Sequence, residues 1–121
     1  MASPTSRSLK FLRDSGWIAC VVERFLPAYG SMKFPRRIDA FNFGDILACS
    51  VEPTSGEGMI ALVQAFPLAR WRDHLAKIAA IKEAQTWKAA GGIILIHGWA
   101  LKPKNGVRGA KKLWTLREER L

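Results

Sequence analysis

Apolar residues fall along the chain in two patterns, one with helical spacing and one typical of strands. Leu9 and Leu12 lie three positions apart in the segment 6–14, which predicts a short helix. After Pro67, the i, i+3, i+4 pattern continues through Leu68, Trp71, Leu75 and Ile78. Beyond Ile78 the apolar stripe moves to another face. We therefore expect a kink, or two short helices, before the chain reaches Gly91.

Five runs rich in β-branched and aromatic residues predict strands. They span 17–25, 38–50 (with a bend at 42–44), 59–66, 93–99 and 113–116. Residues 26–35 predict a loop, 52–58 a hairpin connection and 102–112 a basic hairpin, because each contains Gly, Pro or Ser at turn positions. The order α-β-β-β-α-β-β predicts an α/β fold.

Length and composition indicate one globular domain over 1–121, with 1–5 as a flexible tail. No apolar run approaches the roughly 18 residues that span a bilayer, and the first residues lack the apolar segment of a signal peptide. We therefore expect a cytoplasmic protein with no membrane partner. Cys20 and Cys49 lie in apolar runs without CxxC spacing, which predicts reduced core residues.

The charge distribution separates the middle of the chain from its flanks. The net charge is +9, which indicates a polyanionic partner, nucleic acid above all. Residues 38–66 contain four acids and no Lys or Arg, whereas 1–37 contain seven Lys/Arg and 67–121 contain twelve. This arrangement suits a protein that holds a phosphate backbone and presents carboxylates to a metal ion. The alternative is a basic protein whose acids cluster by chance.

Two polar residues interrupt the apolar runs at the centre of the chain. Asp45 begins one predicted strand and Gln64 lies near the end of the next, so antiparallel pairing could bring the two side chains together. A buried carboxylate must pair with a cation, bind a metal or face water. The alternative is that Asp45 begins its strand at the surface. Glu23 lies near the end of the first strand, where an acid is more often an exposed strand end than a metal ligand.

The order and spacing of these segments resemble the PD-(D/E)XK nuclease superfamily. Gly44-Asp-Ile-Leu-Ala48 and Ala61-Leu-Val-Gln-Ala65 resemble its motifs II and III. The similarity is to small phage and bacterial proteins related to archaeal Holliday junction resolvases, and it covers 8–117. Further matching segments are Arg36-Arg-Ile-Asp39, Trp87 with Gly91-Gly92, His97-Gly-Trp99 and Leu113-Trp-Thr-Leu-Arg117.

The resemblance implies a restriction-endonuclease-like core, in which helices flank a mixed central sheet. It also implies a DNA endonuclease that uses Mg²⁺ or Mn²⁺, held by Asp45, the Gln64 side-chain carbonyl and the backbone carbonyl of Ala65. Glu23 would take the place of the motif I acid, although relatives often place that acid on the first helix. Cleavage of branched DNA needs two symmetric cuts, so a homodimer is expected.

The chain departs from the family pattern in motif III. The family places a Lys two residues after the acid or Gln, and this position is Phe66. Phe can neither donate a hydrogen bond nor hold a charge, so the cation would have to come from the following helix. Lys77 is the first candidate, followed by Arg70 and Arg72; the alternative for Lys77 is a solvated helix face.

Three functions therefore remain open. The first is a metal-dependent endonuclease, and the second is a catalytically inactive DNA-binding protein on the same fold. The third is an RNA-binding or interaction module unrelated to nucleases. If the chain is the endonuclease or the inactive DNA-binding protein, the expected DNA contacts are the cations Lys33, Arg36, Arg37, Arg70, Arg72, Lys102, Lys104, Arg108, Lys111 and Lys112.

The histidines and tryptophans predict structural roles. His74 and His97 lack metal-ligand spacing, so His74 is expected on the helix surface and His97 at a strand end near Trp99. Tryptophan can stack on bases, but Trp71, Trp87 and Trp114 fit the apolar pattern and are expected to pack in the core.

Overall fold

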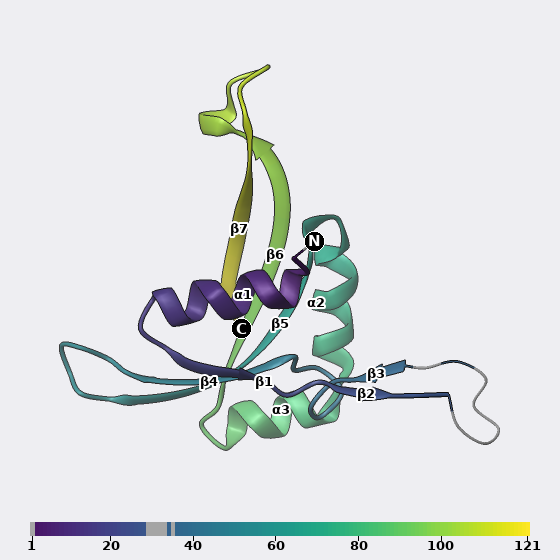
Figure 1. Cartoon of the computed structure of the whole chain (residues 1–121). Helices are drawn as coiled ribbons and strands as arrows, with labels where there is room; N and C mark the ends of the chain where they lie inside the picture. The colour runs from purple at the N-terminus through teal and green to yellow at the C-terminus, as the bar shows by residue number, and fades with distance from the viewer. Residues whose placement is uncertain (1, 29–33, 35) are drawn as a thin grey trace.

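A mixed five-stranded sheet lies at the centre of the fold, with helices on both of its faces (Figure 1). The structure is a computed structural model that describes residues 2–28, 34 and 36–121. Its helices and strands are α1 Pro4–Asp14, β1 Ile18–Val21, β2 Arg24–Leu26, β3 Arg36–Ile38, β4 Ile46–Val51, β5 Gly58–Pro67, η1 Leu68–Arg70, α2 Trp71–Ala80, α3 Lys82–Ala89, β6 Ile93–Pro103, η2 Lys104–Gly106 and β7 Lys112–Arg120.

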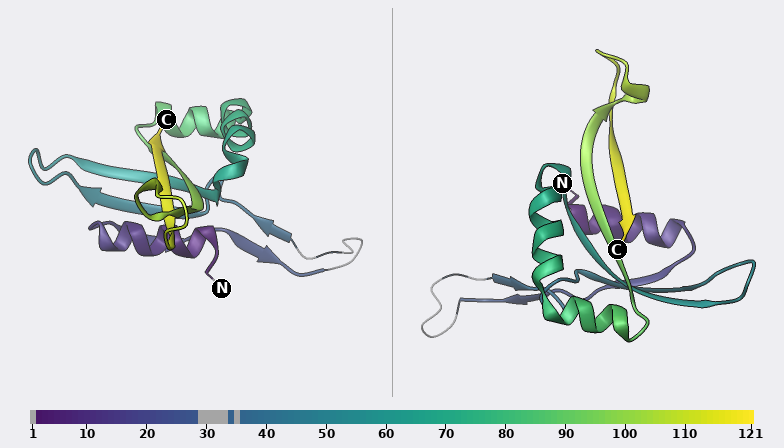
Figure 2. Two further views of the ribbon diagram at one scale, coloured as in Figure 1. Left: turned by 90° about the horizontal axis from the view of Figure 1, so that it is seen from above. Right: turned by 180° about the vertical axis from the view of Figure 1, so that it is seen from behind.

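The sheet has the strand order β1-β4-β5-β6-β7. All neighbours are antiparallel except β5 and β6, which are parallel and are joined by the crossover through η1, α2 and α3. β2 and β3 form a separate two-stranded ribbon. Figure 2 shows that this ribbon, the β4–β5 hairpin and the β6–β7 hairpin project from the body in different directions. No helix in the described part of the chain is long and apolar enough to cross a membrane.

The first helix begins earlier than the sequence pattern predicts. The Ser3 side chain accepts a hydrogen bond from the backbone N–H of Ser6, and Pro4 occupies the first turn, where its missing N–H costs nothing. Residues 4 and 5, expected in a flexible tail, therefore belong to α1. Gly16 follows the helix with a φ of +92°, which only glycine adopts without strain.

Two predicted strands are interrupted, which corrects the expected order. The expected strand 17–25 divides into β1 and β2, because the backbone N–H groups of Val22 and Glu23 both turn toward the carbonyl of Asp45. The expected strand 38–50 divides into β3 and β4, because residues 39–45 form a turn with Phe41 and Asn42 at positive φ. The turn contains the apolar residue Phe43, which is fully buried. Its composition therefore resembles that of a strand.

The predicted break in the long helix is confirmed. The helical segment divides at Ile81, whose extended backbone separates α2 from α3. The last two strands are longer than predicted: β6 continues to Pro103 and β7 covers 112–120, where strands were expected only over 93–99 and 113–116. Their outer residues are exposed on both faces, so the apolar alternation that marks a strand is missing there.

Each face of the sheet has its own core. On one face, Leu12 of α1 packs with Ala19, Ile46 and Val63. On the other face, Trp71 and Ile78 of α2 pack on Leu62, Phe66, Ile94 and Ile96. Because α2 and α3 follow β5 and lead into β6, they cover the β5–β6 half of their face.

The β1–β4 half of that second face has no helix over it. The side chains left exposed there are all apolar or thiol groups: Ile18, Cys20, Leu47, Cys49, Val51 and Ile60. We call this set the apolar sheet face. It corrects the prediction that Cys20 and Cys49 are core residues; both are free and exposed, because alternation places them on the uncovered face.

Candidate metal centre

Asp45 directly precedes β4 and lies between β5 and the end of β1. Its backbone N–H donates to Val63 of β5, and its carbonyl accepts from Val22 at the end of β1. Its Oδ2 accepts hydrogen bonds from the Gln64 side-chain Nε2 and from the backbone N–H of Ala65, each at 2.9 Å. The predicted meeting of Asp45 and Gln64 is therefore confirmed, and the surface position is wrong, since only 3% of Asp45 is exposed.

Two further carboxylates reach Asp45. Glu23 follows β1, Asp39 follows β3, and one carboxylate oxygen from each of the three acids lies within 4.8 Å of the others. Asp39 belongs to the matching segment Arg36-Arg-Ile-Asp39, but it was not among the expected metal ligands, because its segment resembles the start of a continuous strand. The available signal was its place in the base-free stretch 38–66, directly after Arg36 and Arg37.

The environment strongly favours the protonated form of Asp45. Burial raises the pKa of Asp45 from 3.8 to about 8, and a hydrogen bond with Asp39 and the negative charges of Asp39 and Glu23 act in the same direction. The backbone N–H of Ala65 opposes this shift. Asp45 therefore retains a proton near neutral pH unless a cation replaces it.

Two basic side chains lie at the edge of the three acids. Lys77 Nζ on α2 is 3.7 Å from Asp39 Oδ2, and an Arg37 guanidinium nitrogen is 3.4 Å from Glu23 Oε1. Both cations are about half exposed or more, so these pairs are loose. Asp45 has no cationic partner within the described residues, which leaves the most buried carboxylate uncompensated.

The donor set fits a hard divalent cation. Carboxylate and amide oxygens are the ligands that Mg²⁺ and Mn²⁺ take in proteins. The Gln64 Oε1 atom is buried and has no hydrogen-bond partner in the part of the chain that the structure describes. A buried carbonyl without a partner is costly. The amide presents its Nε2 to Asp45, so rotation of the amide by about 180° would turn this carbonyl toward a cation held by the three acids.

Phe66 occupies the place of the expected motif III cation and is buried, with 2% of its surface exposed. Its ring stacks on His74 of α2, with centroids 4.2 Å apart and planes 2° apart, and meets Trp71 edge-on. His74 is therefore half-buried against Phe66, which corrects in part its predicted position on the helix surface. Burial lowers the pKa of His74, and the charges of Lys77 and Arg70 lower it further, so this ring is neutral at pH 7.

The predicted DNA contacts fall into two groups. Arg36 and Arg37 line a hollow of about 380 Å³ together with Asp39 and Lys77, and Arg70 and Arg72 lie at the start of α2. Arg70 pairs loosely with Asp73. The second group is on the β6–β7 hairpin: Lys102, Lys104, Arg108, Lys111 and Lys112. Lys33 lies outside the described residues.

His97 belongs to a buried network at the junction of α1, β6 and β7. Its Nδ1 lies 2.7 Å from Ser8 Oγ and its Nε2 lies 2.7 Å from Glu118 Oε2. Trp99 Nε1 donates to the same Ser8 oxygen at 2.8 Å. His97 and Ser8 are 0% exposed, so neither side chain has access to a substrate and both act in packing.

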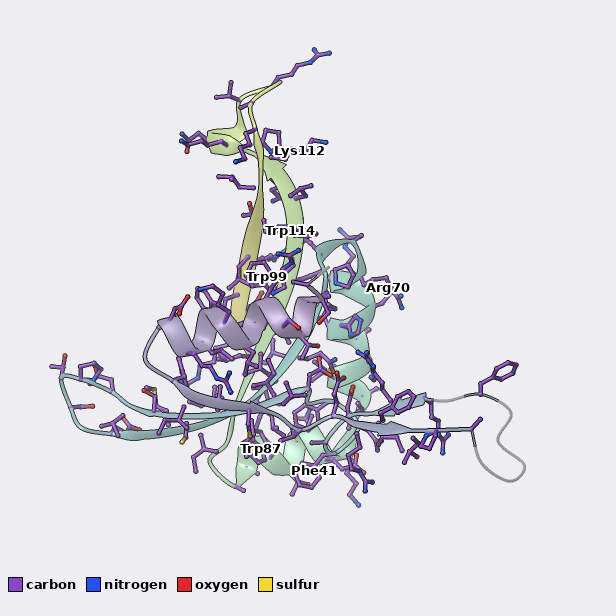
Figure 3. The ribbon with its side chains drawn as sticks, viewed as in Figure 1. Phe41, Arg70, Trp87, Trp99, Lys112 and Trp114 are labelled. Carbon is purple, nitrogen blue, oxygen red and sulfur yellow. The ribbon has the colours of Figure 1, made fainter. Side chains whose placement is uncertain are left out.

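The tryptophans divide between core and surface. Trp71 is buried as predicted, and Trp87 is half-buried, with its Nε1 donating to the carbonyl of Ile93. Trp114 is 46% exposed, so its predicted core position is wrong. It lies on the projecting hairpin (Figure 3). The Arg7 guanidinium covers one face of its ring, 3.7 Å from the ring centroid.

Comparison with known proteins finds no matching family model, no matching curated protein and no matching solved structure.

Proposed function

We propose that this chain is a metal-dependent DNA endonuclease with a restriction-endonuclease-like core. One observation supports this most directly: Glu23, Asp39 and Asp45 converge within 4.8 Å, with the Gln64 amide bonded to Asp45, in a protein with a net charge of +9. A protein that binds phosphate by charge alone gains nothing from clustered acids, because they repel its ligand. A divalent ion between acids and phosphate removes that conflict.

The topology is compatible with this assignment. The family that the sequence resembles has a helix, three antiparallel strands with spaced acids, and a helical crossover to a parallel strand. Here α1, the antiparallel strands β1, β4 and β5, the crossover through α2 and α3, and the parallel strand β6 follow in that order, with the β2–β3 ribbon inserted between β1 and β4. The acids lie at the ends of β1 and β3 and at the start of β4, around one point.

In this proposal the acids and Gln64 hold Mg²⁺ or Mn²⁺, which supplies an acidified water and offsets charge on the phosphate. Lys77 takes the role of the missing motif III lysine. Its ammonium lies at the acid cluster, on the helix next to Phe66, and is 47% exposed, so it can reach a phosphate oxygen. Arg36 and Arg37 bind the flanking backbone of the DNA.

We also propose that two copies associate through the apolar sheet face. Ile18, Cys49 and Ile60 lie side by side across three strands, and more than half of each isoleucine is exposed. The face contains no charged residue, so two copies of a +9 protein meet there with the least repulsion. A two-fold dimer would place two acid clusters for paired cuts in branched DNA.

Phe66 favours a second candidate, a DNA-binding protein on the same fold that does not cut. Its buried ring places no donor where the family has a lysine, and it holds His74 in a neutral stack. If Lys77 does not act on the phosphate, the acid cluster binds a metal without cleavage.

A cleavage assay on labelled four-way junction, linear duplex and single-stranded DNA separates the two candidates. Wild type, Asp45→Asn and the control Asp14→Asn are compared with Mg²⁺ or Mn²⁺; Asp14 is exposed and pairs only with Lys10 in the described structure. Cutting by wild type and Asp14→Asn but not by Asp45→Asn supports the nuclease. Tight binding without cutting by all three proteins supports the second candidate.

A further inference from the structure

The β6–β7 hairpin extends well beyond the body of the protein (Figure 1). We call residues 99–116 of this hairpin the arm. β7 is the edge strand and pairs with β6 alone, from Leu95–Arg120 at the base to Pro103–Lys112 near the tip. In the right-hand view of Figure 2 the outer end of the arm stands clear of α1, α2 and α3 and of the other strands. Most side chains in the outer part of the arm are exposed, so burial of apolar surface does not explain why the arm extends so far.

The arm is a concentrated region of positive charge. Between Glu83 and Glu118 the sequence contains no Asp or Glu. The arm itself contains five exposed cations, namely Lys102, Lys104, Arg108, Lys111 and Lys112. None of the five pairs with an acid in the part of the chain that the structure describes. Such crowded cations repel one another, and a polyanion relieves that repulsion.

The shape of the arm restricts the polyanion. Paired strands lie about 4.8 Å apart, and with their side chains a two-stranded ribbon fits the roughly 12 Å wide major groove of B-form DNA. Each strand rises about 3.3 Å per residue, so the segment from Trp99 to the tip exceeds the groove depth of roughly 8.5 Å. The major groove of an RNA duplex is too narrow and deep for this ribbon.

The base of the arm is fixed on two sides. Trp99 donates to Ser8, and Arg7 lies over the ring of Trp114, so α1 supports one face. On the other face, Arg117 lies 3.9 Å above the ring of Trp71 at the start of α2. Figure 3 shows Arg70, which precedes α2, beside this base, while Lys112 lies farther out along the arm. The cations therefore continue from the arm onto α2, toward Lys77.

We infer that the arm is a groove-binding ribbon for double-stranded DNA, which it holds through the major groove while α2 contacts the adjacent backbone. The inference shares its DNA partner with the proposed function, but it requires neither metal nor cleavage. A second copy of this chain is a poor occupant, because two arms in contact would bring ten cations together.

The test is equilibrium binding in EDTA to a short DNA duplex, the RNA duplex of the same sequence and the corresponding DNA single strand. Lys111→Gln/Lys112→Gln is compared with the matched control Lys82→Gln/Lys88→Gln, which removes two exposed cations from α3. We expect the arm variant to reduce the slope of log affinity against log salt by up to about 1.8 for the DNA duplex, since each phosphate contact contributes about 0.9. The control should retain the wild-type slope.

Wild type should bind the DNA duplex at least about tenfold more tightly than the RNA duplex, and the arm variant should lose most of that preference. Equal losses in both variants, or an unchanged preference in the arm variant, would overturn the inference. So would a shift of the arm variant from dimer to monomer with unchanged DNA binding, since the arm would then contact a second copy.

The two proposals fail in different ways. Duplex binding that depends on the arm, without cleavage in Mg²⁺, contradicts the nuclease and leaves the arm assignment in place. Cleavage in Mg²⁺ combined with a wild-type salt slope in Lys111→Gln/Lys112→Gln contradicts the arm assignment alone.

Discussion

Lys77 Nζ lies 3.7 Å from Asp39 Oδ2, which places a helix ammonium at the edge of three converging carboxylates. Phe66 lies two residues after Gln64 and is buried. The nucleases that the sequence resembles have a lysine at this position. The cation and the apolar ring therefore lie on neighbouring elements, α2 and β5. Whether this exchange preserves catalysis can be measured.

Lys77→Gln should reduce the rate of DNA cleavage by about a hundredfold at saturating metal, because one positioned donor to a transition state contributes roughly that much. Single-turnover cleavage measures the rate, and Lys77→Arg should restore part of it. Metal binding should persist, because Lys77 is not a ligand. The increase in melting temperature on addition of metal measures this binding. A rate equal to that of the control Lys82→Gln would assign Lys77 to the solvated helix face.

The raised pKa of Asp45 predicts a stability that falls with rising pH. The folded state keeps a proton that the unfolded chain releases near 3.8, so the free energy of unfolding decreases as pH rises from about 4 through about 8. Asp45→Asn replaces the carboxyl group by an amide that does not ionise. The variant should therefore become more stable relative to wild type across that window. Thermal unfolding of both proteins without metal measures the difference, in which contributions of the histidines cancel.

Added Mg²⁺ should reverse that order at high pH. A divalent ion binds the ionised carboxylate and displaces the proton, so its stabilising effect on wild type should increase as pH approaches about 8. Asp45→Asn should show little stabilisation at any pH. Equal stabilisation of both proteins by Mg²⁺ would place the ion elsewhere.

The sequence predicted the local features of this site better than its long-range ones. Asp45 and Gln64 meet because strands joined by a short hairpin have few possible registers. Asp39 was counted among the central acids but was not predicted as a ligand beside Asp45, because its position depends on the turn at 39–45, whose positive φ values at Phe41 and Asn42 are not signalled by glycine. The apolar alternation around Cys20 and Cys49 was also read correctly as a strand. This alternation does not indicate which face of the sheet is covered by a helix that follows later in the chain.

The buried network around Ser8 predicts a stability effect without a functional one. Ser8→Ala would leave His97 Nδ1 and Trp99 Nε1 without their partner, and should lower the free energy of unfolding by about 1–3 kcal/mol. Chemical denaturation measures the change. Ser6→Ala, an exposed substitution on the same helix, should have a much smaller effect. Loss of DNA cleavage in folded Ser8→Ala would contradict the purely structural role.

The apolar sheet face predicts a defined response of the oligomeric state. Ile60→Glu places a charge on that face, beside Cys49 and two strands from Ile18, so the proposed dimer should dissociate to monomer. Val107→Glu is the matched control, because Val107 on the arm is 57% exposed and Ile60 is 55% exposed. Sedimentation velocity distinguishes the species. If Ile60→Glu and Val107→Glu sediment alike, whether as dimers or as monomers, the two copies do not meet at this face, and paired cuts would need another interface.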